Sequence, residues 1–184
     1  MASIRRAIAW GVDFIQIREK DVSDRDLFNI TCRGVSMSRG TKCRILVNGR
    51  ADIALAAGAH GVHLPSEGLK VSEIRAWIPK GFIVGVSVHT ESETMDACEQ
   101  NADYVLLGHV LPTASKREYG PSLGIDFLQR VCSRASIPVF ALGGMRSRSV
   151  DPVLAAGAVG VAGISLFQKK AEFTRLKKQW KPFK

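Results

Sequence analysis

The segment Leu55-Ala56-Ala57-Gly58-Ala59-His60-Gly61-Val62 recurs, with Val159 in place of His60, as Leu154-Ala155-Ala156-Gly157-Ala158-Val159-Gly160-Val161. In both copies a glycine follows a helix-forming run, where it supplies the left-handed residue that ends a helix, and an apolar strand-like run comes next. A degenerate third copy is Cys98-Glu99-Gln100-Asn101-Ala102-Asp103-Tyr104-Val105, and a fourth lies at Ile8–Ile15. This repeated helix–turn–strand unit decides the fold class.

Working outward from the repeat, short apolar runs alternate with helix-like segments about every 20 to 35 residues. The predicted strands are Phe14–Arg18, Arg44–Val47, Gly61–Leu64, Ile83–Val86, Tyr104–Gly108, Val139–Leu142 and Val159–Ala162. The predicted helices between them are Asp24–Ser38, Ala51–Ala57, Val71–Trp77, Glu91–Gln100, Ile125–Cys132 and Ser149–Ala155. Because a crossover helix must join successive parallel strands, the alternation predicts a parallel sheet.

This rhythm predicts an α/β fold of the TIM (β/α)8 barrel type rather than a doubly wound dinucleotide-binding sheet, which would need GxGxxG after its first strand. Seven strands are readable, and the chain opens on what should be the first helix, so we expect a barrel that lacks its first β-strand. We expect residues 1–168 to form a single barrel domain and residues 169–184 a basic C-terminal tail. An open strand edge would favour a homo-oligomer.

The composition is that of a globular protein with one ordinary core: 184 residues, of which 46% are hydrophobic and 23% charged. It excludes a disordered chain, and no apolar run is long enough to span a membrane. The four cysteines show no CxxC pair or metal-ligand spacing, so we interpret them as reduced thiols. The N-terminus does not resemble a signal peptide, which makes the cytoplasm the default location.

The net charge of +9 invites a nucleic-acid interpretation, but its distribution argues against one. Residues 169–184 hold seven Lys and Arg side chains against the single acid Glu172, so the tail supplies +6 and the remainder +3. The sequence has no helix-turn-helix or zinc-finger pattern. We therefore expect neither a nucleic-acid partner nor a membrane partner.

Active sites of such barrels lie at the C-terminal ends of the strands. The polar residues at these positions include His63, Ser66, His89 and His109. The others, which we expect to bind substrate, are Gln16, Arg18, Lys20, Asn48, Ser87, Thr113, Ser115 and Lys116. The last two strands end in the glycine-containing turns Gly143-Gly144 and Gly163-Ile164-Ser165, whose backbone N–H groups are suited to holding a phosphate. The basic, hydroxyl-rich set predicts a small anionic, phosphorylated substrate.

Five motifs in chain order resemble the thiamine phosphate synthase/thiazole tautomerase superfamily. They span roughly residues 4–168 and read Gln16-Ile17-Arg18-Glu19-Lys20, Gly61-Val62-His63-Leu64, Gly85-Val86-Ser87-Val88-His89, Asp103-Tyr104-Val105 through Pro112-Thr113 to Lys116, and Ala141-Leu142-Gly143-Gly144-Met145. The resemblance implies thiamine biosynthesis and a phosphorylated thiazole as substrate.

Two departures bear on metal binding. Synthases of this superfamily join a pyrimidine diphosphate to a thiazole phosphate and hold Mg²⁺ with two aspartates. One of them belongs to an Asn-Asp pair that reads Asn48-Gly49 here, and the other ends a run that reads Pro65-Ser66-Glu67-Gly68. Mg²⁺ requires oxygen ligands, so we expect no metal cofactor unless the synthase alternative holds. Glu67 is the alternative carboxylate.

A third departure favours the tautomerase branch. Synthases usually carry Gly-Pro where this chain has Gly108-His109, whereas tautomerases have Gly-His-Val and a Leu-Pro-Ser run like Leu64-Pro65-Ser66. The resemblance implies a thiazole tautomerase, an isomerase in which His109 moves a proton that aromatises a carboxythiazole phosphate. Two alternatives stay open: thiamine phosphate synthase, a transferase, and a catalytically silent thiazole- or thiamine-phosphate-binding regulatory protein.

Overall fold

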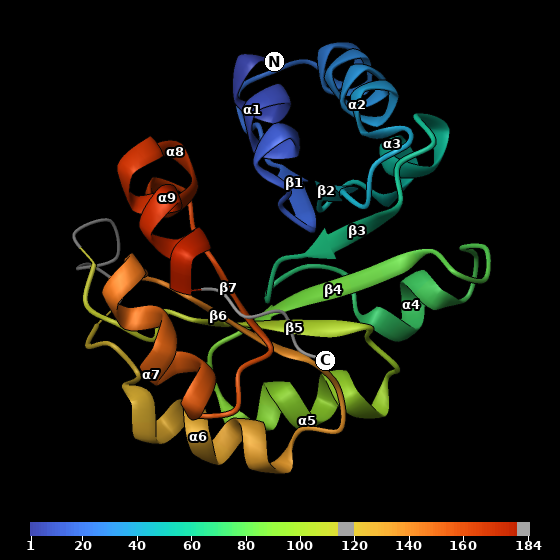
Figure 1. Ribbon diagram of the computed structural model, residues 1–184. Coiled ribbons are helices and arrows are strands. Elements are labelled where there is room, and N and C mark those ends of the chain that lie inside the picture. Colours follow the sequence, from blue (N-terminus) through green and yellow to red (C-terminus); the bar gives the residue numbers. More distant parts are fainter. Residues whose placement is uncertain (114–119, 180–184) are drawn as a thin grey trace. The chain divides into compact units, whose positions relative to one another are not determined.

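A computed structural model describes residues 1–113 and 120–179, which fall into two compact units, Met1–Val86 and Ser87–Lys184. Both units alternate strands with helices, and all strands paired within a unit are parallel (Figure 1). No helix within the described residues is both long and apolar enough to cross a membrane.

Unit 1 opens on a helix and contains four strands in chain order. Its elements are α1 (Ala2–Trp10), β1 (Phe14–Ile17), α2 (Asp24–Ser38), β2 (Arg44–Asn48), α3 (Ala51–Ala56), β3 (Gly61–Leu64), α4 (Val71–Arg75) and β4 (Ile83–Val88), the last of which runs two residues past the unit boundary. The sheet order is β1-β2-β3-β4, with Asn48 paired to His63 at the ends of β2 and β3.

The core of unit 1 is built from the apolar strand residues that the pattern predicts. Ile45 and Val47 on β2 and Val62 on β3 are fully buried. Gly58, with φ of +67°, ends the turn after α3 in the left-handed region. Gly61 begins β3 where a Cβ would lie 2.2 Å from the carbonyl oxygen of Ile83, so no larger residue fits the close approach of β3 and β4.

Unit 2 continues the alternation with three further strands. Its elements are α5 (Glu91–Glu99), β5 (Tyr104–Gly108), α6 (Ile125–Arg134), β6 (Val139–Leu142), the 3₁₀ turn η2 (Ser147–Ser149), α7 (Val150–Ala155), β7 (Gly160–Ala162), α8 (Ser165–Gln168) and α9 (Lys170–Gln179). The order is β5-β6-β7. Helices α5, α6 and α7 contact one another in succession (Figure 1).

Seven strands are present in the described residues, as predicted, and the α/β fold of the TIM type is confirmed. The bounds of α2, β3, β5 and β6 match the prediction, whereas β4 runs two residues further, to Val88. Helix α2 was predictable because Ser23 accepts a hydrogen bond from the backbone N–H of Asp26 and caps it. The other bounds differ by one or two residues at frayed ends.

The segment predicted as a basic tail contains the helix α9, which packs against η2. Phe173 and Leu176 bury their side chains, and Glu172 accepts hydrogen bonds from the backbone N–H and the hydroxyl of Ser147 at 3.0 and 3.1 Å. Phe173 and Leu176 are three residues apart and share one face of the helix. This apolar spacing favours packing of the helix, whereas the prediction of a tail considered only its net charge.

Candidate functional site

In unit 2 the segment that follows β5 lies directly on the turn that follows β6. The backbone N–H of Val110 donates to the carbonyl of Leu142 at 2.8 Å, and that of Leu111 donates to the carbonyl of Gly143 at 3.2 Å. The two segments therefore continue to hydrogen-bond beyond the ends of β5 and β6. As a result, His109 lies against the Gly143-Gly144 turn.

Both glycines of that turn are required by backbone geometry and by lack of space. Gly143 has φ of +96°, and a Cβ on it would lie 2.3 Å from the Cβ of His109. Gly144 has φ of +68°, and its Cβ would lie 2.7 Å from the Cβ of Leu111 and from the carbonyl oxygen of Pro112. Any L side chain here would be strained and would collide with neighbouring backbone.

A second pair of hydrogen bonds closes the loop that follows His109. The N–H of Leu123 donates to the carbonyl of His109 at 3.0 Å, and the N–H of Gly124 donates to that of Val110 at 2.9 Å. Thr113 is half-buried near the start of this loop. Ser115 and Lys116, both predicted to bind substrate, lie outside the described residues.

His89 is a residue at this strand end that the predicted site omits. Its Nδ1–H donates to the carbonyl oxygen of Gly108 at 2.5 Å, next to His109. The N–H groups of His89 and Thr90 both donate to the carboxylate of Glu93, which fixes the start of α5. The signal in the sequence was the spacing of Ser87 and His89, which places them on one face at the end of β4.

The turn after β7 presents exposed residues ahead of a single helical turn. Gly163 is half-buried, Ile164 is 74% exposed, and Ser165 is exposed and begins α8. Among the described residues, the backbone N–H groups of Gly144 and Gly163 donate no hydrogen bond to protein. Phosphate binding at the two turns stays a prediction, and these N–H groups agree with it.

In unit 1 the predicted residues lie at the ends of β1 and β2. Gln16 and Arg18 are exposed on either side of the buried Ile17, and Lys20 is exposed further along. Asn48 is half-buried at the last position of β2. Lining of a substrate pocket by these four side chains stays a prediction.

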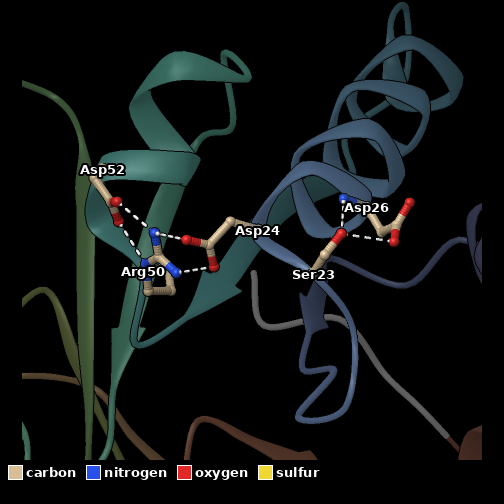
Figure 2. Close-up of polar contacts among 5 residues, drawn as sticks. All are labelled: Ser23, Asp24, Asp26, Arg50 and Asp52. Carbon is tan, nitrogen blue, oxygen red and sulfur yellow. Dashed lines mark hydrogen bonds and ion pairs between the residues drawn. The ribbon is translucent and has the colours of Figure 1, made fainter.

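An ion-pair cluster next to Asn48 was not foreseen. The guanidinium of Arg50 lies between Asp24 at the start of α2 and Asp52 in the first turn of α3 (Figure 2). Its Nε donates to Asp52 at 2.9 Å, and its Nη2 donates to Asp52 at 2.7 Å and to Asp24 at 3.2 Å. These hydrogen bonds lower the pKa of Asp52. Arg50 therefore links the N-termini of α2 and α3, and its positive charge is paired with two carboxylates of the protein.

Burial lowers the pKa of two histidines of unit 1. His63 is 1% exposed on β3, and burial lowers its pKa to about 4. His60 accepts a hydrogen bond at Nδ1 from the backbone N–H of Ile45 at 3.0 Å, and burial lowers its pKa as well. Both side chains therefore have a part in the packing of unit 1.

The residues at the ends of β2 and β3 do not fit a magnesium site. The two aspartate positions are Gly49 and Gly68, the alternative carboxylate of Glu67 is exposed, and Asp24 and Asp52 bind Arg50. No group of three or more His, Cys, Asp or Glu residues within 1–113 and 120–179 could hold a metal ion. A hard cation needs several oxygen ligands, which these residues do not supply together.

Comparisons with known proteins identify the family. The chain is 42% identical over 165 residues to a putative thiamine-phosphate synthase of Geobacter sulfurreducens, covering 90% of this chain and 78% of that one. It is 38% identical over 170 residues to a thiamine-phosphate synthase of Methanoculleus marisnigri, covering 92% and 81%. A thiamine phosphate pyrophosphorylase structure from Pyrococcus furiosus superposes with a TM-score of 0.86 at 29% identity, covering 96% and 87%.

These names overturn the prediction of a thiazole tautomerase, and with it the assignment of the chain as an isomerase. The prediction rested on a few local departures, the glycines at positions 49 and 68 and the stretches Gly108-His109 and Leu64-Pro65-Ser66, whereas the similarity to synthases extends over most of the chain. The family model described as thiamine monophosphate synthase matches residues 1–167, and the chain belongs to this family.

Proposed function

We propose that the chain is a thiamine-phosphate synthase, a transferase that joins a pyrimidine diphosphate to a thiazole phosphate and releases diphosphate. The observation that carries the proposal is the family match over residues 1–167, together with relatives named thiamine-phosphate synthase that the chain covers to about four fifths of their length. The product bond forms between the two heterocycles as the bond to the diphosphate breaks.

In this proposal the glycine turns of unit 2 bind the phosphate of the thiazole. The N–H groups of Gly144 and Gly163 supply donors, and the exposed hydroxyl of Ser165 adds a third. Fixed backbone donors stabilise a phosphate without reorganising when it binds. The tight contact of His109 and Leu111 with the Gly143-Gly144 turn supports this role, because it holds the turn in one conformation.

In this proposal His109 lies beside the bound thiazole and does not transfer a proton to or from it. Its backbone is fixed by the hydrogen bonds that close the loop at Leu123 and Gly124, and the histidine is half-buried. Gln16, Arg18, Lys20 and Asn48 are the candidates for binding substrate in unit 1. No step here is assigned to a metal ion, because the residues of unit 1 do not fit one.

The test is formation of thiamine phosphate from the two substrates by the purified full chain, with and without added Mg²⁺. We expect Ser165→Ala to raise the KM for thiazole phosphate about tenfold, the loss of one hydrogen bond to a charged group, with little change in stability. Ser136→Ala, an exposed serine ahead of β6, is the matched control and should leave the KM unchanged. Binding of both substrates without product would contradict the proposal.

A further inference from the structure

Gly49 and Gly68, at the positions where the resemblance implies aspartates, both lie near one proline. A Cβ on Gly49 would be 3.9 Å from Cδ of Pro65, and a Cβ on Gly68 would be 3.0 Å from both Cδ and Cγ of Pro65. The two Cβ positions are thus no more than 6.9 Å apart, a separation across which two carboxylates can share one cation.

Backbone hydrogen bonds fix this arrangement. The N–H of Gly49 donates to the carbonyl of His63 at 2.8 Å, which joins the ends of β2 and β3. The N–H of Gly68 donates to the carbonyl of Pro65 at 3.0 Å and closes the turn Pro65–Gly68. Pro65 comes directly after the fully buried strand β3, and its ring fixes its own φ, so the backbone that leads into the turn is restricted.

The charges nearby are already balanced without a metal ion. Arg50, the residue after Gly49, donates to Asp52 and to Asp24, and four of its five N–H groups are used in doing so (Figure 2). A divalent cation would have to compete with this guanidinium for either aspartate. The end of β2 therefore lies next to a fixed cation, the guanidinium of Arg50, and to the apolar ring of Pro65.

We propose that Pro65 takes the place of the divalent cation that the resemblance implies: its ring lies against positions 49 and 68, and unit 1 binds no Mg²⁺ of its own at this strand end. Three features act together here, the glycine at each of the two positions and the rigid ring next to both. The proposal concerns the protein before substrate binds, so it does not depend on the proposed synthase activity.

The first experiment titrates the full chain with Mn²⁺ alone and measures free Mn²⁺ by electron paramagnetic resonance. We expect the wild-type chain to have no site with Kd below about 1 mM. The variant Gly49→Asp/Pro65→Gly/Gly68→Asp should gain one site that binds at least ten times more tightly. Gly49 has φ of +70°, a conformation that aspartate tolerates better than most residues.

The matched control adds the same charge to the same turn at other positions, as Pro65→Gly/Ser66→Asp/Leu69→Asp. It should not gain the site. A wild-type chain that binds one Mn²⁺ tightly, or a control that binds as well as the designed variant, would overturn the proposal. Because neither titration contains substrate, failure of the synthase assay leaves both results interpretable.

A second experiment tests the contact between the Pro65 ring and position 68 by thermal stability, and it needs no metal. Gly68→Ala places a Cβ 3.0 Å from the Pro65 ring and should lower the Tm by about 3 °C. In the Pro65→Gly background the same substitution should cost less than half as much. An equal loss in both backgrounds would mean that the Pro65 ring does not occupy the space next to position 68, and would overturn the proposal.

Discussion

The strand ends of the two units are stabilised by different means. At the ends of β2 and β3 in unit 1, a half-exposed guanidinium joins Asp24 and Asp52, and the turn beyond it is exposed. At the ends of β5 and β6 in unit 2, backbone hydrogen bonds extend the pairing, and two glycines admit the segment that follows β5. One end depends on charge and the other on the absence of side-chain volume.

Because of this difference, we expect the stability of the two ends to respond to different changes in solution conditions and sequence. Ion pairs in contact with water weaken with salt and with acid, whereas close backbone packing responds to neither and is disrupted by a single methyl group. The rigid end carries the turns that we propose for phosphate, and the charge-dependent end has glycine at both positions where the resemblance implies metal-binding aspartates. Each prediction below disturbs one of the two units.

The largest effect is expected at the glycine turn of unit 2. Gly143→Ala combines a left-handed φ with a Cβ 2.3 Å from that of His109, so it should lower the free energy of unfolding by about 3 kcal/mol or more. The measurement is urea denaturation of the full chain. Gly58→Ala in unit 1 has the same handedness but open space around its Cβ, and should cost about 1 kcal/mol. Equal losses would contradict the close approach.

A comparable effect is expected from acid, through His63 in unit 1. Its pKa is about 4 when folded and near 6.5 when unfolded, so the unfolded chain binds the proton first as the pH falls. Stability should therefore decrease from pH 6.5 downward and lose roughly 3 kcal/mol by pH 4. The slope, from urea denaturation at several pH values, should be shallower in His63→Gln. An unchanged slope would remove His63 as its cause.

The smallest effect is expected from Arg50. Because its side chain and both partners are substantially exposed, Arg50→Gln should cost about 1 kcal/mol or less at low salt, and less still in 1 M NaCl. The control is Arg33→Gln, an exposed arginine on α2. A loss that is independent of salt would show that packing, not charge, joins the two helices.

The same cluster has a defined response to pH. The pKa of Asp52 is lowered by the hydrogen bond from Arg50, so its contribution is complete above the ordinary aspartate pKa and is lost as the pH falls through the folded value. Below that range, wild type and Arg50→Gln should converge in stability. A difference that persists in acid would indicate that the ionised Asp52 is not the partner that matters.

The sequence predicted most of the scaffold because local signals agree with the fold. Ser23 and Asp24 mark the start of α2, and Gly58 and Gly157 mark the turns after α3 and α7. The two adjacent glycines after β6 were predicted to form a turn, and the structure places them where neighbouring backbone leaves no room for a side chain. These features depend on residues near one another in the chain, where spacing and conformational preference are informative.

The parts that escaped prediction depend on residues far apart in the chain. Nothing in the spacing of Asp24, Arg50 and Asp52 indicates that they meet, and nothing in the sequence indicates that the Pro65 ring lies near both Gly49 and Gly68. The choice between synthase and tautomerase failed for the opposite reason. A few residues at Gly108-His109 were given more importance than similarity over the whole chain.

The central claim is that this chain joins two substrates despite a unit 1 without metal-binding carboxylates. The most direct measurement follows a reaction of the wild-type full chain with both substrates by ³¹P NMR, which resolves thiazole phosphate, thiamine phosphate and released diphosphate. The account predicts that thiamine phosphate and diphosphate appear in equal amounts. Unchanged substrate signals in the presence of Mg²⁺, from a chain that binds thiazole phosphate, would contradict it.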